Sequence, residues 1–461
     1  MKVLLVKPPS MSDHIQPPVG LAYLAGAIQH EHSAAILDML KTRMTDEEFC
    51  GYVQSGQFDV VGFQCYTQEL QSVAKLAALV KSVSKDIVTI AGGPHPTLLP
   101  KETMEYLSTT LDFLLRGEGD ITFPLFLQCL KQNLKNIETV SGLIWKQADK
   151  VIENAPHEFV KDLNALPLPA WELIQPQTYP PAQHGAFFKK FPIAPIVTTR
   201  GCPYACKFCS APVLSGRNVR FHDPEKILNE IRLLHSQYGI REIHIIDDNF
   251  TINRSHANAV LTKIIEAKLD ISIAFPNGIR VETVDKELLD LMKRAGAYLI
   301  SLGIESGSDR ILQLMNKKLK VAATEEKVNL IHKAGLDVAG FFVIGFPGDT
   351  KEDIEKTIKF SLKLPLIRAN YFDFLPLPGT PIYYELEQKG ELAKIDWKQF
   401  HFMTAPYAPA GMTREQLRSY QRKAFLRFYL RPRILIRNIL GIKSFLHLKY
   451  LVRRFYHWLL M

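Results

Sequence analysis

The sequence predicts an α/β protein made of two strand–helix series and a basic, helical C-terminal region. Its 461 residues are too many for one ordinary domain and enough for two with sizeable cores. Short apolar runs alternate with helical patterns over residues 1–135 and again over residues 193–400. Residues 136–192 between them are typical of a hairpin and a proline-rich linker, and residues 401–461 form the tail. We therefore expect two domains, a linker and a tail with these boundaries.

The first series predicts a doubly wound parallel sheet with helices on both faces. Its expected strands are Val3–Val6, Ala34–Leu37, Val60–Phe63, Ile87–Ala91 and Phe113–Leu115, and its expected helices are Leu21–His30, Thr45–Ser55, Leu70–Val83 and Thr122–Leu130. Ligands of such sheets bind at the carboxyl ends of the strands. Those ends carry Pro8 and Pro9, then Gly92-Gly93-Pro94-His95-Pro96, then Gly117-Glu118-Gly119. Glycine lets backbone approach a ligand closely, so we expect a large ligand there.

The second series predicts a partial (β/α)6 barrel of the TIM type. Its expected strands are Ile196–Thr199, Glu242–Ile246, Ser272–Phe275, Tyr298–Leu302, Val338–Ile344 and Tyr371–Leu375, and its expected helices are Glu225–Gln237, Ser255–Ala267, Lys286–Ala295, Thr324–Ala334 and Lys351–Leu362. In such barrels the chemistry lies at the C-terminal ends of the strands. The residues that directly follow each strand are therefore the candidates for the site.

Composition and charge exclude several classes of protein. The chain is 47% hydrophobic and 22% charged, which indicates neither disorder nor a fibrous architecture. There is no secretory signal, and no apolar run reaches the roughly 18 residues that span a bilayer. With only six cysteines, three of them crowded together, a reducing cytoplasm fits best. The net charge of +9 divides into +11 for residues 412–461 (twelve Lys or Arg minus Glu415) and −2 for the rest, so the catalytic part is not a nucleic-acid binder by composition.

The strongest motif is Cys202-Pro-Tyr-Ala-Cys206-Lys-Phe-Cys209, which follows the first strand of the second series. Thiolates are soft ligands that favour iron–sulfur clusters or zinc. A structural zinc site needs a fourth ligand, for which His222 is the nearest candidate. Three thiolates on a four-iron cluster leave one iron open, and we expect this cluster rather than zinc.

At these residues the sequence resembles the radical S-adenosylmethionine superfamily, whose three cysteines have the spacing CxxxCxxC with an aromatic residue before the third, here Phe208. The resemblance implies that the open iron of a [4Fe-4S] cluster binds S-adenosylmethionine and that one electron cleaves it to methionine and a 5′-deoxyadenosyl radical. It also implies that Asp248 meets the amino group of S-adenosylmethionine. Arg280 could pair with its carboxylate, and Ser301 and Glu305 with its ribose or amino acid part, although solvated or structural roles remain open for all four.

The N-terminal motifs resemble the cobalamin-binding branch of this superfamily over roughly residues 1–400. In that branch a corrinoid lies on the carboxyl end of the N-terminal sheet. The residues expected to contact cobalamin are Pro8, Pro9, Thr67, Gly92, Gly93, His95, Gly117 and Glu118. The Asp-x-His-x-x-Gly motif that supplies a lower axial histidine is missing where Lys7-Pro8-Pro9-Ser10 stands, so the resemblance implies cobalamin without histidine ligation. For His95, a role in shaping a turn stays open.

The tail interleaves cationic and apolar residues at helical spacing over 431–460. This pattern is typical of a helix on an anionic bilayer, with Tyr456 and Trp458 at the headgroups, or of a helix packed on the barrel with a basic outer face. We expect a cytoplasmic enzyme, possible peripheral contact with the inner face of the membrane, and a reducing electron donor such as flavodoxin or ferredoxin.

The leading reaction is methylation of an unreactive carbon or phosphorus of a small-molecule or lipid substrate, and we expect carbon. The alternatives are an oxidative cyclase that resembles the anaerobic porphyrin cyclases, a non-catalytic iron–sulfur or corrinoid carrier, and a tRNA-modifying enzyme. The tRNA alternative is disfavoured because the N-terminal domain lacks a further cysteine triad.

Overall fold

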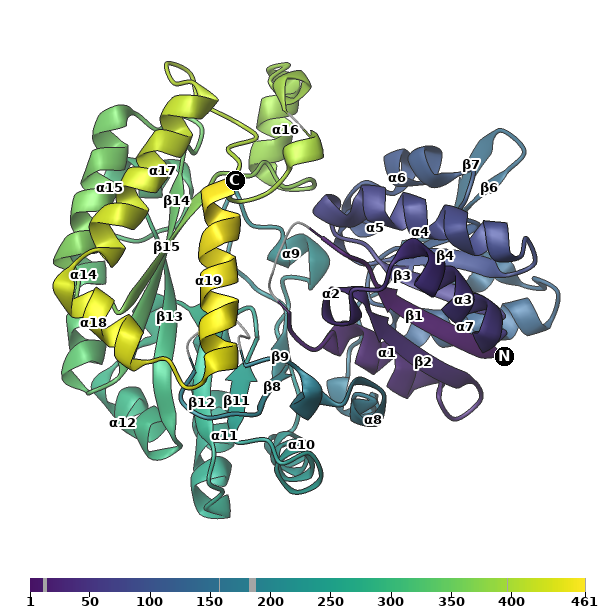
Figure 1. The fold of residues 1–461 in the computed structure, drawn as a ribbon, viewed down its shortest axis with the longest axis horizontal. Coiled ribbons are helices and arrows are strands. Elements are labelled where there is room, and N and C mark those ends of the chain that lie inside the picture. The colour runs from purple at the N-terminus through teal and green to yellow at the C-terminus, as the bar shows by residue number, and fades with distance from the viewer. Residues whose placement is uncertain (11–14, 157, 182–187, 396, 461) are drawn as a thin grey trace. The chain divides into compact units, whose positions relative to one another are not determined.

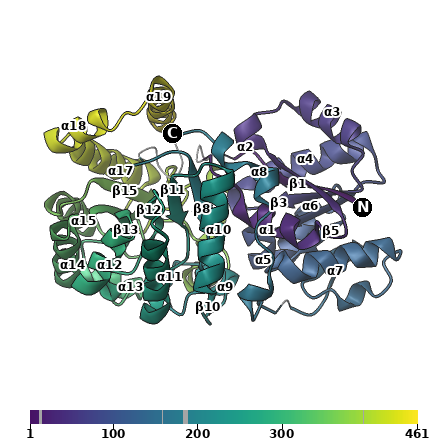
Figure 2. The same ribbon diagram turned by 90° about the horizontal axis from the view of Figure 1, so that it is seen from below.

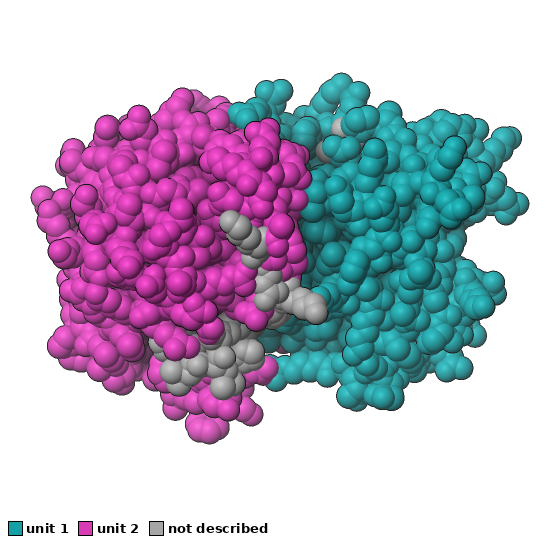
Figure 3. All heavy atoms as spheres, turned by 90° about the horizontal axis from the view of Figure 1, so that it is seen from above, with its two compact units in different colours: residues 1–175, 211–220 teal, residues 176–210, 221–461 magenta. Residues whose placement is uncertain are grey.

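The computed structural model describes residues 1–10, 15–156, 158–181, 188–395 and 397–460, and the side chains of residues 394, 398 and 457–460 lie outside this description. The chain divides into two compact units, coloured separately in Figure 3. Unit 1 comprises residues 1–175 and 211–220, and unit 2 comprises residues 176–210 and 221–461.

Unit 1 is built on a seven-stranded sheet in the order β2-β1-β3-β4-β5-β6-β7. The strands are β1 (Lys2–Lys7), β2 (Ser33–Asp38), β3 (Val60–Gln64), β4 (Val88–Gly92), β5 (Phe113–Leu115), β6 (Leu143–Gln147) and β7 (Lys150–Glu153). β1 to β5 pair in parallel, and the β6–β7 hairpin adds two antiparallel strands at the edge beside β5. The predicted doubly wound parallel sheet is confirmed.

Both faces of this sheet are covered, because alternate side chains of a strand point to opposite faces. Val3 and Leu5 pack with α1 (Val19–Ile28) and α7 (Gly119–Lys131). Leu4 and Val6 pack on the other face with α3 (Asp46–Gly56), α4 (Leu70–Val83) and α6 (Pro100–Leu107). A strand that is buried on both faces must be apolar throughout, which explains the continuous run Val3–Val6.

The connection between β4 and β5 contains two helices that were not predicted. These are α5 (Pro94–Leu98) and α6 (Pro100–Leu107), where the glycines and prolines had indicated a ligand-facing strand end. Both helices begin with proline, which is tolerated in the first turn because the missing N–H has no partner there. The remaining helices of the unit are α2 (Met39–Thr42), α8 (Trp171–Ile174) and α9 (Ala211–Leu214).

Unit 2 contains a six-stranded parallel sheet in the order β15-β14-β13-β12-β11-β8, which is the predicted partial barrel (Figure 1). Its strands are β8 (Ile193–Ile196), β11 (Glu242–Ile245), β12 (Ser272–Ile279), β13 (Ala297–Glu305), β14 (Asp337–Ile344) and β15 (Arg368–Asp373). The helices between and after them are α10 (Pro224–Gln237), α11 (Arg254–Ala267), α12 (Lys286–Arg294), α13 (Asp309–Leu314), α14 (Val321–Lys333), α15 (Lys351–Lys363) and α16 (Pro381–Gln388). Three tail helices follow: α17 (Arg414–Tyr429), α18 (Pro432–Leu440) and α19 (Phe445–Leu460).

Several predicted strand bounds in unit 2 differ from the structure, including those of β15, which is Arg368–Asp373 rather than Tyr371–Leu375. The first barrel strand is Ile193–Ile196 rather than Ile196–Thr199, and it includes Pro195. Because β8 is the edge strand of the sheet, proline costs little there. β12 continues past Phe275 to Ile279, and an irregular register against β13 absorbs the intervening Pro276 and Gly278.

Candidate functional site

In unit 1 the predicted residues at the ends of β3 and β4 lie together. Gly93 has a φ of +108°, and a Cβ there would lie 3.3 Å from both N and O of Cys65, so glycine is required by conformation and by space. The Cys65 carbonyl accepts a hydrogen bond from the amide of His95 (3.0 Å), and the amide of Cys65 donates to the carbonyl of Gly92 (2.8 Å). The glycine pair thus holds the turn after β4 against the end of β3.

His95 lies buried beneath this turn, 5% exposed, with Nδ1 at 3.1 Å from the hydroxyl of Thr67. Burial lowers the pKa of His95 to about 4, so the imidazole is neutral at neutral pH. Thr97, to which no site role was assigned, donates to the carbonyl of Gly93 (2.7 Å) and accepts from the amide of Gly117 (2.9 Å). The structure therefore brings Thr67, Gly93, His95 and Gly117 to one edge of the sheet.

Glu118 is engaged with a residue far along the chain. Its carboxylate forms a two-pronged ion pair with Arg220, with Nη1–Oε2 at 2.7 Å and Nη2–Oε1 at 2.9 Å, and both side chains are 9% exposed. Glu118 also accepts from the amide of Val160 (2.8 Å), while Arg220 donates to the carbonyls of Val160 and Ser215. Sequence reasoning missed Arg220, because a separation of 102 residues leaves no local signal.

The carboxyl ends of β1 and β2 hold a second buried ion pair. Lys7 lies 3.2 Å from Asp38, at the ends of β1 and β2, and also donates to the carbonyl of Gln16 (2.9 Å). Pro8 is buried and Pro9 is exposed. Lys7 thus has a structural role, because it links the ends of β1 and β2, at the position where a motif with an axial histidine would begin.

In unit 2 the segment Cys202–Cys209, which we call the cysteine loop, is held in place by three hydrogen bonds. The amide of Lys207 donates to the carbonyl of Met315 (3.0 Å), and its carbonyl accepts from the amide of Ile382 (3.2 Å). The side chain of Asn316 donates to the carbonyl of Ala205 (2.7 Å). Cys206 is 9% exposed, and Cys202 and Cys209 are half-buried. The loop is therefore held by the residues that follow α13 and by the first turn of α16.

Two cations lie beside Cys206. The guanidinium of Arg280 donates through Nη1 to the Cys206 sulfur (3.7 Å), donates to the carbonyl of Lys317 (2.7 Å), and lies 3.8 Å over the ring of Tyr204. Its nearest carboxylate is Glu282, and although burial lowers the pKa of Arg280, the Glu282 hydrogen bond and charge raise it overall. Arg280 is thus placed at the cysteine loop, as its position after β12 predicted, with an acidic partner already bound.

Lys317 is the second cation, and sequence reasoning missed it. Its ammonium lies 2.7 Å from Glu305 and 5.9 Å from the ring centre of Phe208. Burial lowers the pKa of Lys317, but the charges of Glu305 and Cys206 raise it overall, so it is cationic. Glu305 has a φ of +63° at the end of β13, an uncommon conformation for a residue other than glycine that holds its carboxylate beside Lys317.

The acidic pair after β11 separates into two roles. Asp247 is buried and accepts from the amide of Thr198 (2.6 Å) and the hydroxyl of Thr199 (3.0 Å), and burial raises its pKa to about 6. Asp248 is exposed, and after burial its charge is among the causes that raise the pKa of Cys202. Asp248 therefore lies at the cysteine loop, whereas Asp247 ties the end of β11 to the residues after β8.

Ser301 is buried in the middle of β13, two and four residues before Gly303 and Glu305 on the same face of the strand. Ser301 therefore lies four residues before the end of β13 at which Glu305 contacts Lys317. Phe208 packs edge-on against Phe346, 6.5 Å between ring centres, in a cluster with Met315 and Phe374. The aromatic residue of the motif thus anchors the loop to the barrel.

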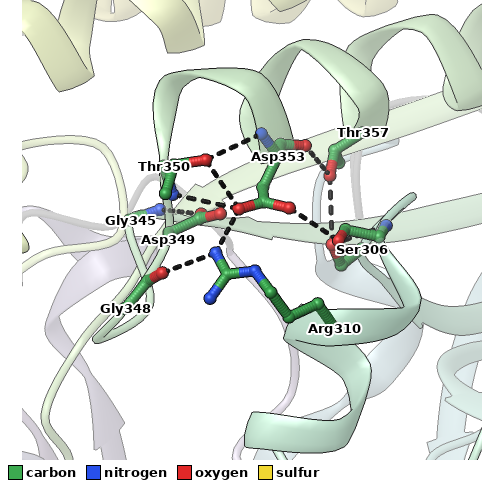
Figure 4. A network of polar contacts seen from close by, with 9 residues as sticks. Ser306, Arg310, Gly345, Gly348, Asp349, Thr350, Asp353 and Thr357 are labelled. Carbon is green, nitrogen blue, oxygen red and sulfur yellow. Dashed lines mark hydrogen bonds and ion pairs between the residues drawn. The ribbon is translucent and has the colours of Figure 1, made fainter.

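The glycine run after β14 is held by the polar network of Figure 4. Asp353 accepts from the hydroxyl of Thr350 (2.7 Å) and from Arg310, which also donates to the carbonyl of Gly348 (2.8 Å). Although burial raises it, the hydrogen bonds from Arg310 and its neighbours lower the pKa of Asp353 to about 2. The network therefore ties the loop after β14 to α13 and α15.

Within the described ranges, no three His, Cys, Asp or Glu side chains are arranged around a single metal ion. His222 is buried, and its amide donates to the carbonyl of Thr198. A four-iron cluster binds each thiolate at a different iron, so its ligands need not converge on one point. Three cysteines on one fastened loop beside two cations suit a cluster that carries net negative charge with thiolate ligands.

Comparisons with known proteins agree with this arrangement. The model of the radical SAM superfamily matches residues 196–361, and that of the B12 binding domain matches residues 12–127. An uncharacterized methyltransferase of Pyrococcus horikoshii is 32% identical over 452 residues, 97% of this chain and 96% of the relative. The cytidylyl-2-hydroxyethylphosphonate methyltransferase of Streptomyces wedmorensis is 27% identical, over 84% of this chain and 82% of the relative.

Among solved structures, OxsB, a cobalamin-dependent S-adenosylmethionine radical enzyme with aqua-cobalamin and S-adenosylmethionine bound, superposes with a TM-score of 0.76. The match covers 99% of this chain and 71% of OxsB at 15% identity, which shows the shared fold. With 32% identity over nearly the whole length of one relative and both family models in the expected order, the chain belongs to the cobalamin-dependent radical S-adenosylmethionine enzymes, whose cofactors are a [4Fe-4S] cluster, S-adenosylmethionine and cobalamin.

Proposed function

We propose that this enzyme transfers a methyl group to an unactivated carbon of a small, apolar substrate. The observation that carries the proposal is the fastened cysteine loop with Arg280 and Lys317 beside Cys206, in one chain with a sheet of the B12-binding type. Relatives named as methyltransferases of carbon centres support it, including the hopanoid C-2 methylase of Rhodopseudomonas palustris and the bacteriochlorophyllide d C-12(1)-methyltransferase of Chlorobaculum tepidum.

In this proposal Cys202, Cys206 and Cys209 hold the cluster. When bound, the three cofactors supply reductive cleavage of S-adenosylmethionine and a carrier for the methyl group. The chain contributes positioning: Arg280 and Lys317 place positive charge where thiolates, cluster and the methionyl carboxylate accumulate negative charge. Hydrogen bonds to cluster sulfurs also set the reduction potential of such clusters.

Three further side chains would contact S-adenosylmethionine. Asp248, exposed near Cys202, suits the amino group, because a carboxylate attracts an ammonium. Glu305 is positioned by its ion pair with Lys317 to bind a hydroxyl or the amino acid part. Ser301 would serve only the deepest part of that ligand, since it lies within β13.

Cobalamin would lie on the edge of the unit 1 sheet formed by Pro8, Pro9, Thr67, Gly92, Gly93, His95 and Gly117, beside Glu118, whose carboxylate is held by Arg220. Supporting this, the edge offers hydroxyl and backbone groups, which the amide side chains of a corrinoid can bind. His95 would support the turn rather than ligate cobalt, because its Nδ1 is taken up by Thr67 and its ring is 5% exposed. We therefore propose that cobalamin binds here without His95 as a ligand of its cobalt.

An oxidative cyclase is the second candidate, because the anaerobic magnesium-protoporphyrin IX monomethyl ester cyclase of Cereibacter sphaeroides is 26% identical over 421 residues. Products distinguish the two reactions. Methyl transfer gives S-adenosylhomocysteine together with 5′-deoxyadenosine, whereas cyclisation gives 5′-deoxyadenosine alone. A flavodoxin or ferredoxin is the class of donor we propose for the electron.

The test is anaerobic reconstitution with iron, sulfide, hydroxocobalamin, S-adenosylmethionine and a strong reductant, followed by mass spectrometry of both nucleosides and of bound corrinoid. Cys206→Ala should lose the iron–sulfur absorbance and 5′-deoxyadenosine while it retains corrinoid. Cys50→Ala, on α3 of unit 1, is the matched control and should retain both. A Cys206→Ala protein with an intact cluster would contradict the proposed ligand set, and 5′-deoxyadenosine without S-adenosylhomocysteine would favour the cyclase.

A further inference from the structure

The three tail helices form the outer layer along one side of unit 2 (Figures 1 and 2). α17 is docked firmly, since Leu417, Ala424 and Phe428 are buried and α17 packs against β15. α18 and α19 are attached by fewer residues. In α18 only Ile434 is buried, and in α19 the buried residue among the described side chains is His447, whose ring centre lies 5.0 Å from that of Phe188.

An ordinary surface helix turns its apolar stripe toward the protein, whereas α19 exposes an apolar stripe. Phe445, Leu448, Val452 and Phe455 recur at intervals of three and four, which places them on one face. That face is exposed, with exposures of 83% for Phe445, 59% for Val452 and 58% for Phe455. The face turned toward the protein carries the buried His447 and the half-buried Tyr450, Leu451 and Arg454. Tyr456 is 60% exposed, while the side chain of Trp458 lies outside the described part of the chain.

α18 and the end of α17 also expose apolar side chains. The large apolar residues that are exposed in the three helices and at the C-cap of α17 are called the tail face: Leu426, Leu430, Leu435, Ile436, Ile439, Leu440, Phe445, Leu446, Leu448, Val452, Phe455 and Tyr456. They are twelve of the twenty-two large hydrophobic side chains that are exposed in the described structure. Such a concentration in about thirty consecutive residues marks an interaction surface, because soluble proteins rarely leave large apolar patches in water.

Cations border the tail face and have no acidic partner in the described structure. Arg433, Lys443, Lys449 and Arg453 are exposed, and no ion pair is formed by any of them with a described residue. Three other tail cations do form ion pairs: Lys423 and Arg427 with Glu355, and Arg437 with Asp337. In α19, Lys449 and Arg453 fall on the flank of the apolar stripe.

We propose that the tail face binds the surface of an anionic phospholipid bilayer, with α18 and α19 lying in the interface. Apolar side chains would enter the acyl boundary while the bordering cations meet lipid phosphates. A second copy of the chain is a poor occupant, because residues 412–461 carry +11 and two such surfaces would repel each other. No helix in the described ranges is long and apolar enough to cross a membrane. The inference is independent of the reaction proposed above.

The experiment is flotation of the full-length protein with vesicles of phosphatidylcholine, alone or mixed with phosphatidylserine. Wild type should float with the mixed vesicles and be released by raised salt. Neutralising Lys449 and Arg453 (Lys449→Gln/Arg453→Gln) should weaken binding about 25-fold, since each cation near an anionic surface contributes a factor of about five. Phe445→Ser/Val452→Ser/Phe455→Ser should abolish flotation without changing thermal unfolding, because these side chains are exposed.

Matched controls come from exposed positions of unit 1. Ile121→Ser/Leu125→Ser removes two exposed apolar side chains from α7, and Lys85→Gln/Lys135→Gln removes two exposed cations. Both controls should float like wild type. Absence of wild-type flotation, or equal loss in tail and control variants, would overturn the proposal. Dimerisation in solution that the triple serine variant abolishes, without vesicle binding, would assign the tail face to a second copy instead.

Discussion

The ion pair of Glu118 and Arg220 yields the sharpest prediction, because it separates a structural role of Glu118 from a role in binding cobalamin. Both side chains are 9% exposed, and the two contacts of 2.7 and 2.9 Å are those of a two-pronged pair. Glu118→Gln preserves size but leaves the guanidinium buried without a counter-charge. Removing one partner of a buried pair costs about 3–5 kcal/mol of unfolding free energy.

The expected result follows from the size of unit 1, which spans 185 residues (175 plus 10). For a domain of this size each kcal/mol shifts the melting temperature by about 2–4 °C, so Glu118→Gln should lower Tm of the cofactor-free protein by about 6–20 °C. The matched control is Glu153→Gln, which breaks the pair with Lys101 (3.8 Å, lysine 69% exposed) in the same unit. An exposed pair contributes about 1 kcal/mol at most, so this control should move Tm by no more than about 4 °C.

Calorimetry of cofactor-free protein, paired with titration by hydroxocobalamin, is the assay. Glu118→Leu/Arg220→Met should recover part of the lost stability, because apolar residues can replace a buried ion pair. The reasoning is refuted if Glu118→Gln melts with the Glu153→Gln control but no longer binds cobalamin. Glu118 would then be a cofactor contact, as its place after β5 predicted.

Two further predictions concern buried charge in unit 2. Burial raises the pKa of Asp373 to about 7, against about 3.9 in an unfolded chain. The folded state therefore holds a proton that the unfolded state releases, and stability should fall as pH rises from about 4 to about 7, by on the order of 4 kcal/mol. Because Asp247 also has a raised pKa, Asp373→Asn should reduce this fall, not abolish it, in urea midpoints measured across the window, and an unchanged slope would contradict the assignment. Lys317→Met leaves the carboxylate of Glu305 buried alone and should cost about 3–5 kcal/mol in urea unfolding, whereas Lys317→Arg should cost clearly less; equal losses would show that charge is not the cause.

The parallel sheets could be predicted because their signal is local. Val3 to Val6 is apolar without interruption, and the structure buries alternate members on opposite faces, as parallel strands require. Local signals also misled. The run Gly92-Gly93-Pro94 was expected at a ligand-facing strand end, but Pro94 begins a helix, and Pro195, which lay outside the predicted first barrel strand, belongs to an edge strand. In each case proline's meaning depended on which backbone groups needed partners, which tertiary structure decides.

The candidate site shows the same division. The motif from Cys202 to Cys209 could be recognised because all its ligands lie within one loop. Its electrostatic partners could not: Arg280 lies 74 residues from Cys206, and Lys317 joins the site only because α13 returns the chain beneath the cysteine loop. Asp247 and Asp248 are adjacent residues of the same type, yet Asp247 is buried and has a structural role whereas Asp248 is exposed.

The cysteine spacing and the charged residues around Cys206 affect the cofactor site in different ways. The type of ligand residue decides which cofactor a loop can hold, and here the ligand residues are cysteines only a few positions apart in the sequence. The energy of charge in the site depends instead on cations and carboxylates that reach it from separate strands, such as Arg280 with Glu282 and Lys317 with Glu305. Substitutions in those four residues would leave the cysteine motif intact while changing the field around Cys206. Relatives that share the three cysteines can therefore differ in reduction potential and in the binding of S-adenosylmethionine, and the residues after β12 and β13 are where such differences should be sought.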